Sequence, residues 1–84
     1  MPPPVVTLYG RAGCHLCDEA LAVLQRLRPR LGFEIAEVDI ESDDALLQRY
    51  VFAIPVIAVG EHEVARAPVR AEALEDALRE ALPG

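Results

Sequence analysis

The sequence predicts an α/β fold with the element order βαβαββα, in which helices flank a mixed four-stranded sheet. Short aliphatic runs alternate with segments whose apolar residues recur every three or four positions, as expected of strands alternating with amphipathic helices. The last two strands are separated only by a turn at Gly60-Glu61, which predicts an antiparallel hairpin. Strands joined through a helix are expected to lie parallel, so the sheet should be mixed.

The first half of the chain is expected to form a strand, a helix and a second strand. Residues 5–9 are a run of apolar and β-branched side chains, which is typical of a strand buried on both faces. From Cys14 onward the apolar positions mark one face of a helix that Pro29 and Gly32 end. Residues 33–40 largely alternate apolar and polar side chains and predict the second strand. The inward residues expected in the helix are Leu16, Ala20, Val23, Leu24, Leu27 and Leu31.

The second half is expected to form a short helix, a hairpin and a final helix. Ser42 is the expected N-cap of the short helix, because its hydroxyl can accept a hydrogen bond from an unpaired backbone N–H. Residues 55–59 and 62–67 predict the two hairpin strands, and residues 71–82 predict the final helix. The expected buried residues of the two helices are Leu46, Leu47, Tyr50, Leu74, Ala77, Leu78, Ala81 and Leu82.

Length and charge limit the function classes. With 84 residues, the chain is expected to form one domain, preceded by an extended proline-rich lead-in at residues 1–4. The formal net charge is −6, opposite in sign to the basic surface that phosphate binding requires, so we do not expect a nucleic-acid partner. The acidic helix faces are either solvated surface or a means of selecting a basic partner.

The longest apolar stretch, residues 51–59, is interrupted by Pro55 and is far shorter than a membrane span, so we expect no membrane association. The start of the chain does not have the pattern of a secretory signal, which favours a cytoplasmic location. In that compartment disulfides are usually transient, and two cysteines three positions apart are better explained as reactive thiols than as a structural link.

The segment from Gly10 to Cys17 places a C-x-x-C pair where a predicted strand is followed by a predicted helix. In the first turn of a helix, unpaired backbone N–H groups and the dipole stabilise a negative sulfur and lower the pKa of a thiol. Cys14 is therefore the candidate nucleophile, and Cys17, one turn later and nearer the core, is the candidate resolving thiol. Gly13 leaves the Cys14 sulfur approachable, and Arg11 adds positive charge nearby.

The cysteine pair also has non-redox interpretations. A zinc site would use His15 and His62 as further ligands, but the sequence has no second cysteine pair and His15 lies between the two cysteines. A structural disulfide across so short a loop would constrain the unfolded chain little. His15 either raises the oxidising tendency of the pair through partial positive charge or is only an exposed helix residue, whereas His62 is expected to be surface.

Ile54 and Pro55 are the second candidate feature, because a proline begins a predicted strand within an apolar run. A cis Ile54-Pro55 bond would turn the backbone of Ile54 sideways and expose its N–H and C=O to an extended ligand strand. A trans proline that protects a strand end explains the position equally well. The residue pattern leaves both isomers open.

Together these features resemble the thioredoxin fold, and the short chain resembles glutaredoxins most. The resemblance rests on the strand–C-x-x-C–helix junction, on Ile54-Pro55, on the hairpin and on the final helix. The C-H-L-C and V-x-A-I-P-V segments look like those of small bacterial glutaredoxin-like proteins. The resemblance implies dithiol–disulfide exchange in which Cys14 attacks the substrate, Cys17 resolves the mixed disulfide and a cis Pro55 packs against the cysteine pair.

The chain departs from that pattern in the region where glutaredoxins receive glutathione. Glutaredoxins usually have a Gly-Gly pair and an acidic residue before the last helix, where this chain reads Ala67-Pro68-Val69-Arg70-Ala71-Glu72. Arg11 and the Ile54 backbone remain possible contacts for glutathione. We therefore expect glutathione to be a poor reductant and a dithiol donor, such as a thioredoxin-reductase-like flavoprotein or dihydrolipoamide, to serve better.

The function expected from the sequence is a monomeric thiol–disulfide oxidoreductase that reduces protein or mixed disulfides. Its site would comprise the catalytic Cys14 and Cys17 with Arg11, Gly13, His15, Ile54 and Pro55 around the substrate. No cofactor beyond its own dithiol and no metal is expected. The alternative is a non-catalytic binding module that holds a metal or a protein segment at the cysteine pair.

Overall fold

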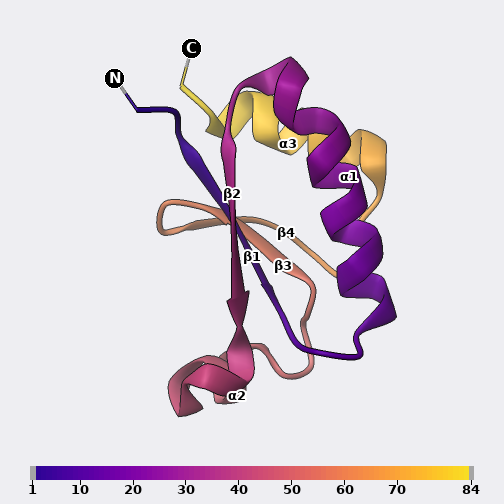
Figure 1. Ribbon diagram of the computed structural model, residues 1–84, viewed down its shortest axis with the longest axis vertical. Helices are drawn as coiled ribbons and strands as arrows, with labels where there is room; N and C mark the ends of the chain where they lie inside the picture. Colours follow the sequence, from indigo (N-terminus) through magenta and orange to yellow (C-terminus); the bar gives the residue numbers. More distant parts are fainter. Residues whose placement is uncertain (1, 84) are drawn as a thin grey trace.

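The computed structural model describes residues 2–83 and contains a four-stranded sheet with the strand order β2-β1-β3-β4. In the described part, β1 and β2 pair in parallel, whereas the β1–β3 and β3–β4 pairs are antiparallel. The predicted mixed α/β sheet is confirmed. Strands joined through a helix were expected to lie parallel; this holds for β1 and β2 but not for β2 and β3, since β3 runs antiparallel to β1. The short helix between β2 and β3 stays at the sheet end where β2 finishes, so the chain enters the sheet again in the opposite direction (Figure 1). The elements are β1 (Val5–Gly10), α1 (His15–Leu31), β2 (Glu34–Asp39), the 3₁₀ helix η1 (Ile40–Ser42), α2 (Asp44–Tyr50), β3 (Val56–Val59), β4 (His62–Arg66) and α3 (Ala71–Ala81).

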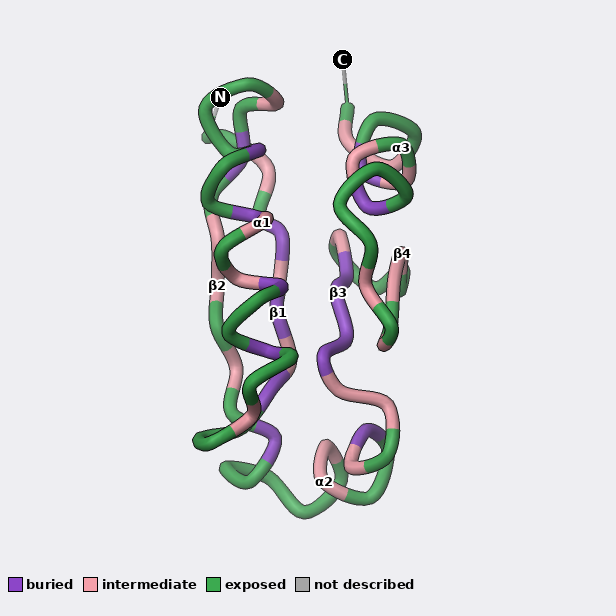
Figure 2. Tube along the Cα trace, turned by 90° about the vertical axis from the view of Figure 1, so that its right-hand side faces the viewer, coloured by how far each residue is buried: buried purple, intermediate pink, exposed green. Residues whose placement is uncertain are grey.

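The helices α1 and α3 cover the same face of the sheet, and α2 lies at one end of it (Figure 1). Figure 2, turned by 90°, shows α1 in front of β1 and β2, with the buried positions of the helix facing the strands. The main core fills the space between these layers. It consists of Val6, Leu8, Ala20, Leu24, Leu27, Phe33, Ile57, Leu74 and Leu78.

A second apolar cluster packs around α2. Its buried members Ile40, Tyr50 and Val56 come from η1, α2 and β3, and the ring of Tyr9 lies 4.9 Å from that of Tyr50. Successive side chains of a strand point to opposite faces, so β1 contributes Leu8 to the main core and Tyr9 to this cluster. The end of β1 is thereby held on both faces next to the cysteine segment.

Three details of the helices differ from the sequence-based expectations. Asp43, not Ser42, caps α2: its Oδ1 accepts from Ala45 N at 2.7 Å, whereas the Ser42 hydroxyl donates to Asp39 O at 2.6 Å. Helix α1 continues through Pro29 to Leu31 and ends at Gly32 alone, which has a left-handed φ of 74°. Pro29 has no N–H to donate to the carbonyl of Gln25, but both residues lie on the exposed side of the helix, where water can pair with that carbonyl.

Leu16 is the third difference, because it was expected on the inward face and is 55% exposed. It lies in the first turn of α1, where the next residue, Cys17, is buried in its place. Element boundaries otherwise shift by about one residue: β1 includes Gly10, β2 excludes Phe33 and Ile40, and β4 ends at Arg66. Residues 2–4 of the expected lead-in lie outside any helix or strand, and Met1 is outside the described residues.

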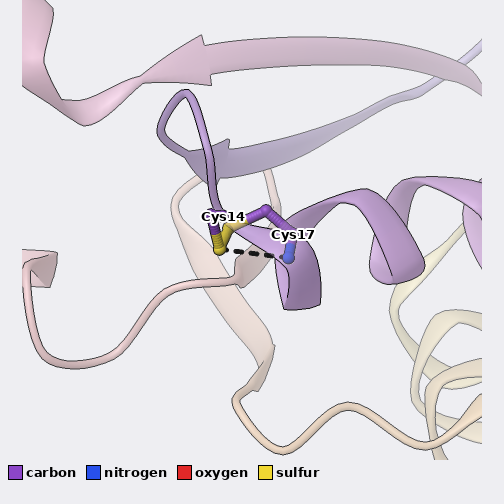
Figure 3. Close-up of a disulfide and its surroundings, with 2 residues drawn as sticks. All are labelled: Cys14 and Cys17. Atoms are coloured by element: carbon purple, nitrogen blue, oxygen red, sulfur yellow. Dashed lines mark hydrogen bonds between the residues drawn. A yellow bond between two sulfur atoms is a disulfide. The ribbon is translucent and has the colours of Figure 1, made fainter.

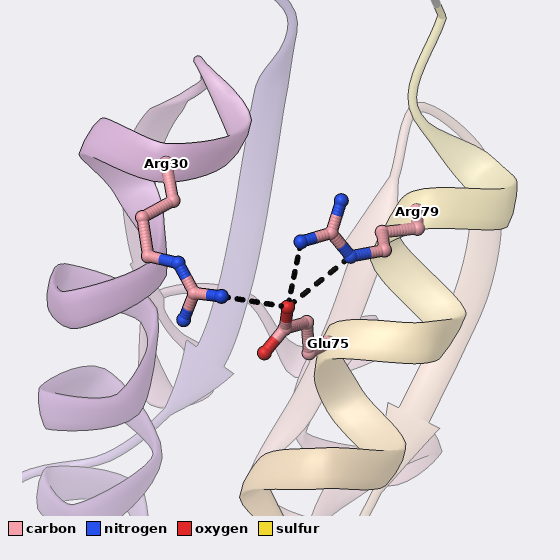
Figure 4. Close-up of polar contacts among 3 residues, drawn as sticks. All are labelled: Arg30, Glu75 and Arg79. Atoms are coloured by element: carbon pink, nitrogen blue, oxygen red, sulfur yellow. Dashed lines mark hydrogen bonds and ion pairs between the residues drawn. The ribbon is translucent and has the colours of Figure 1, made fainter.

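Glu75 connects α3 to α1 through two arginines (Figure 4). Its Oε2 accepts hydrogen bonds from Arg79 Nη2 and Nε at 2.8 and 3.1 Å, and from Arg30 Nη2 at 3.2 Å. The hydrogen bond from Arg79, aided by the charge of Arg30, holds the pKa of Glu75 below its usual range, although desolvation opposes this. The carboxylate in the middle of α3 is thus joined to the C-terminal end of α1.

We predict that Glu75→Gln makes the free energy of unfolding less sensitive to acid. A carboxyl whose pKa is lower in the folded chain stabilises it above the unfolded pKa, about 4.3 for glutamate, and loses that contribution as pH falls through the folded value. Urea unfolding from neutral to acidic pH should therefore show a smaller loss of stability in Glu75→Gln than in the wild type. Glu80→Gln, an exposed change in the same helix, is the matched control, and equal acid sensitivity in wild type and Glu75→Gln would contradict the assignment.

Candidate functional site

Cys14 and Cys17 lie where β1 gives way to α1, at the end of the sheet that also carries α2 (Figure 1). Cys14 is the N-cap of α1 and Cys17 is in its first turn, with a Cα–Cα distance of 5.2 Å. Their sulfur atoms are joined in a disulfide (Figure 3). Gly13, immediately before Cys14, has φ 77°, a left-handed conformation that non-glycine residues rarely adopt. This turn brings the chain from the strand into the helix.

The Cys14 sulfur performs the capping role that an oxygen usually has at a helix start. The backbone N–H of Cys17 donates a hydrogen bond to Cys14 Sγ at 3.1 Å (Figure 3). The N–H of Asp18 donates to the Cys14 carbonyl at 3.1 Å and so begins the helical hydrogen-bond pattern. When the disulfide opens, the same N–H and the positive end of the helix dipole stabilise negative charge on this sulfur.

The two cysteines differ in their access to solvent. Cys14 is half-buried, whereas Cys17 is only 6% exposed. Gly10 contributes to this burial, since a Cβ added there would lie 3.1 Å from Cys17 Sγ and 3.2 Å from its Cβ. Cys14 is therefore the more accessible of the two cysteines.

Ile54 and Pro55 approach the cysteine segment through the pairing of β3 with β1. Tyr9 pairs with Val56 in this antiparallel register, which places Pro55 next to Gly10 when the register is continued by one residue. Pro55 is buried and the Ile54–Pro55 bond is cis, as is the Ala67–Pro68 bond. The proline thus lies at the sheet end that holds the cysteines.

The backbone of Ile54 differs from the sequence-based expectation. Its N–H was expected to be free for a ligand strand, but it donates to the carbonyl of Tyr50 at 3.1 Å. The chain leaves α2 through a tight turn in which the N–H of Ala53 also donates to the Tyr50 carbonyl, at 2.8 Å. Because the N–H already has a partner, an incoming strand would rely on the Ile54 carbonyl alone.

Both cationic candidates beside Cys14 face carboxylates. Arg11 Nη2 lies 2.6 Å from Glu41 Oε2, and His15 Nε2 lies 3.2 Å from Glu19 Oε2. Arg11 therefore does not add the unbalanced positive charge expected from the sequence. The His15 side chain is 87% exposed, which agrees with a surface position.

A hollow of about 300 Å³ lies beside the cysteine segment, on the side of β2. Cys17 and four charged residues contribute to the wall of this hollow. These are Arg11, Asp18, Glu37 and Asp39. Three acids thus surround a single arginine in the space next to the buried cysteine.

Residues 2–83 include no group of three or more histidine, cysteine or acidic side chains arranged to hold a metal ion. In this part of the chain, no helix is long and apolar enough to cross a bilayer. His62, the other histidine considered as a ligand, is exposed at the start of β4.

A family described as “Glutaredoxin-like domain (DUF836)” matches residues 5–79, which is most of the chain. The chain belongs to this glutaredoxin-like family. The match covers the cysteine segment, the Ile54–Pro55 turn and nearly all of α3.

Solved structures similar to this glutaredoxin-like chain support the same fold. Ne2328 from Nitrosomonas europaea is 30% identical with a TM-score of 0.80, over 99% of this chain and 95% of that one. XcR50 from X. campestris is 33% identical with a TM-score of 0.76, over 93% and 99%. Glutaredoxin from Brucella melitensis is 27% identical with a TM-score of 0.61, over 96% and 84%. The predicted thioredoxin-like fold and glutaredoxin-like resemblance are confirmed.

Sequence reasoning missed the residues that surround and neutralise the site. Glu19 lies four positions after His15, so helical spacing alone could have indicated that pair. Glu41 is separated from Arg11 by 30 positions, and no local pattern signals their contact. The Tyr50 carbonyl that occupies the Ile54 N–H is a backbone group, which the sequence does not reveal.

We predict that Gly13→Ala destabilises the oxidised protein by about 1–2 kcal/mol because alanine disfavours the left-handed backbone at this position. A Cβ at Gly13 would meet no atom within 4 Å, so the cost is conformational. Gly13→Asn is the matched control and should cost less, since asparagine tolerates this conformation better. Urea unfolding of the oxidised variants measures both, and an alanine variant as stable as the wild type would contradict the prediction.

Proposed function

We propose that this glutaredoxin-like chain is a thiol–disulfide oxidoreductase that reduces disulfides through Cys14 and Cys17. The observation that carries the proposal is the half-buried Cys14 sulfur at the start of α1, which accepts the Cys17 N–H at 3.1 Å. The family match and the disulfide between the two cysteines support it. The proposed location is the cytoplasm, where external reductants keep such a cysteine pair reduced.

In the proposed reaction the Cys14 thiolate attacks one sulfur of a substrate disulfide. A bond forms between Cys14 and that sulfur, and the other substrate sulfur leaves as a thiolate that takes a proton. Cys17 then gives up its proton and attacks Cys14 Sγ, which forms the Cys14–Cys17 disulfide and releases the second substrate thiol. Two electrons pass from the protein dithiol to the substrate, and an external thiol reductant or reductase restores the dithiol.

Each cysteine has a role that matches its position. Cys14 is the proposed nucleophile because it is less buried than Cys17 and its sulfur caps the positive end of a helix. Cys17 is the proposed resolving thiol because it is buried within bonding distance of Cys14 and shielded from external sulfur. Gly10 is a positioning residue, since only a residue without a side chain leaves room for the Cys17 sulfur at this distance.

The proposed substrates are proteins with accessible disulfides or mixed disulfides. Leu16 is 55% exposed between the two cysteines, and Phe52, two positions before Ile54, is fully exposed. Apolar side chains of this size near the cysteine segment and the Ile54–Pro55 turn suit contact with a polypeptide. Ile54 can still accept a hydrogen bond from a substrate backbone through its carbonyl.

A dithiol is the proposed electron donor. Residues 67–70 lack the Gly-Gly pair that the resemblance associates with glutathione, and Arg70, the N-cap of α3, makes no side-chain capping hydrogen bond. Loss of one charge-assisted contact costs about 1.5–3 kcal/mol, or roughly tenfold to more than a hundredfold in affinity. The occupied Ile54 N–H removes another contact that glutathione would need.

We predict that the wild type reduces a protein disulfide, that Cys14→Ser is inactive and that Cys17→Ser accumulates a mixed disulfide with the substrate. The serine at position 17 leaves the attacking sulfur in place but removes the group that resolves the intermediate. Turnover with dihydrolipoamide as donor measures activity, and mass spectrometry under non-reducing conditions detects the trapped species.

Cys14→Ser is the matched control for the trapping experiment, because it removes the other sulfur by the same change. A mixed disulfide on Cys17 in that variant, in place of Cys14, would reverse the assigned roles. An inactive wild type that binds one zinc ion per chain would contradict the proposal and favour the non-catalytic binding module.

A further inference from the structure

We propose that Glu41 is a specificity-determining residue that neutralises Arg11 and makes the site select against anionic thiols, in favour of neutral or basic polypeptide segments. This inference rests on the proposed thiol–disulfide exchange at Cys14. It assigns a role to an ion pair outside the cysteine motif.

Arg11 is the basic residue of the loop that leads from β1 to Cys14. It lies three residues before Cys14, whose N–H donates to the Arg11 carbonyl at 3.3 Å. A free guanidinium here would attract a carboxylate or sulfonate and raise the local concentration of anionic thiols at the sulfur. The 2.6 Å contact of Arg11 Nη2 with Glu41 Oε2 balances this charge.

The backbone fixes Glu41 close to Arg11. Glu41 lies in η1, directly after β2, and its N–H donates to Asp39 Oδ1 at 2.8 Å. Asp39 pairs with Gly10 at the end of the parallel β1–β2 register, one residue before Arg11. Because β1 and β2 end side by side, the Glu41 carboxylate and the Arg11 guanidinium lie at the same end of the sheet. Little additional ordering is needed for them to meet.

The remaining charges around Arg11 are also negative. Asp18, Glu37 and Asp39 share the hollow with Arg11 and the buried Cys17. On the helix side, Glu19 faces His15, the other candidate cation, at 3.2 Å. An anionic thiol must displace Glu41 or approach a surface of like charge, whereas a neutral or basic segment meets no such barrier.

The test is reduction of the Cys14–Cys17 disulfide by three small thiols that differ in charge: mercaptoethanesulfonate, mercaptoethanol and cysteamine. In each case one thiolate attacks Cys14 Sγ, and Cys17 leaves as a thiolate and is protonated. A second thiolate then attacks the sulfur of the first reagent, which forms the small-molecule disulfide and releases Cys14 as a thiolate that takes a proton. Two small thiols are oxidised for each protein disulfide reduced. The ratio of the anionic to the neutral rate constant is compared between variants, so that the intrinsic reactivity of each reagent cancels.

Glu41→Gln should raise this anionic-to-neutral ratio about three- to tenfold at low salt, and the increase should shrink at high salt because mobile ions screen the freed guanidinium. The cationic-to-neutral ratio should fall. An exposed ion pair adds little to folding stability, so the variant is expected to fold. The rate with mercaptoethanol checks this directly, and Glu41→Ala provides a second variant.

Glu34→Gln is the matched control. It removes the same charge from an exposed pair, Arg28–Glu34 at 2.8 Å, at the opposite end of β2, and should leave both ratios unchanged. The double variant Arg11→Gln/Glu41→Gln should return the anionic-to-neutral ratio to near the wild-type value, because the unpaired guanidinium is what attracts the anion.

An unchanged ratio in Glu41→Gln, with a normal rate for mercaptoethanol, would overturn this inference and leave the proposed function intact. A ratio that stays raised in the double variant would show that Glu41 acts without Arg11, which also overturns it. A wild-type disulfide that mercaptoethanol does not reduce would instead refute the proposed function, and this inference with it.

Discussion

The site depends on the hydrogen bond from the Cys17 N–H to Cys14 Sγ at 3.1 Å. This bond defines the start of α1, because a sulfur takes the place of the oxygen that usually caps a helix. The two cysteines lie one turn apart, and Cys17 is buried whereas Cys14 is only half-buried. A donor held by the backbone stabilises a negative sulfur without any charged side chain.

The rest of the fold holds this start of α1 in place. The apolar core between α1, α3 and the sheet fixes the helix, and the aromatic cluster around Tyr50 fixes the opposite face of β1. Gly13 allows the sharp entry into the helix, and Gly10 gives the Cys17 sulfur its space. Substitutions at either glycine therefore act on the site through the backbone and not through lost chemistry.

Electrostatics around the pair arises from separate parts of the chain. Arg11 and His15, the two basic residues close to Cys14 in the sequence, each face a carboxylate. In the proposed reaction, the Cys17 N–H and the dipole of α1 stabilise the Cys14 thiolate. In this account, the backbone of α1 controls the reactivity of Cys14, whereas the charged side chains around it control which thiols and substrates are favoured.

Much of the architecture follows from local sequence patterns. The aliphatic run of β1 and the periodic leucines of α1 each carry their own signal, and the C-x-x-C pair could be placed between them before any contact was known. The Asp43 cap was missed because Ser42, Asp43 and Asp44 are all good caps and only the backbone geometry selects one. Leu16 follows the helical period, but burial also requires a neighbouring surface to pack against.

The parts that could not be predicted are contacts between distant segments. The Arg11–Glu41 pair requires β1 and β2 to end together, and the Ile54 N–H loses its availability through the turn after α2. Neither the ion pair nor this hydrogen bond has a sequence signature, since each depends on how the fold brings two segments together. The sequence therefore predicted which residues form the site more easily than which carboxylates pair with its basic residues or which backbone N–H groups already have a partner.

The most direct measurement for the central claim is the alkylation rate of each cysteine in the fully reduced protein. Iodoacetamide is added for increasing times, and mass spectrometry of peptides quantifies modification at Cys14 and Cys17 separately. Cys14 should react faster by about tenfold or more, because it is accessible and lies at the helix start, whereas Cys17 is buried. Equal rates, or faster modification of Cys17, would contradict the account.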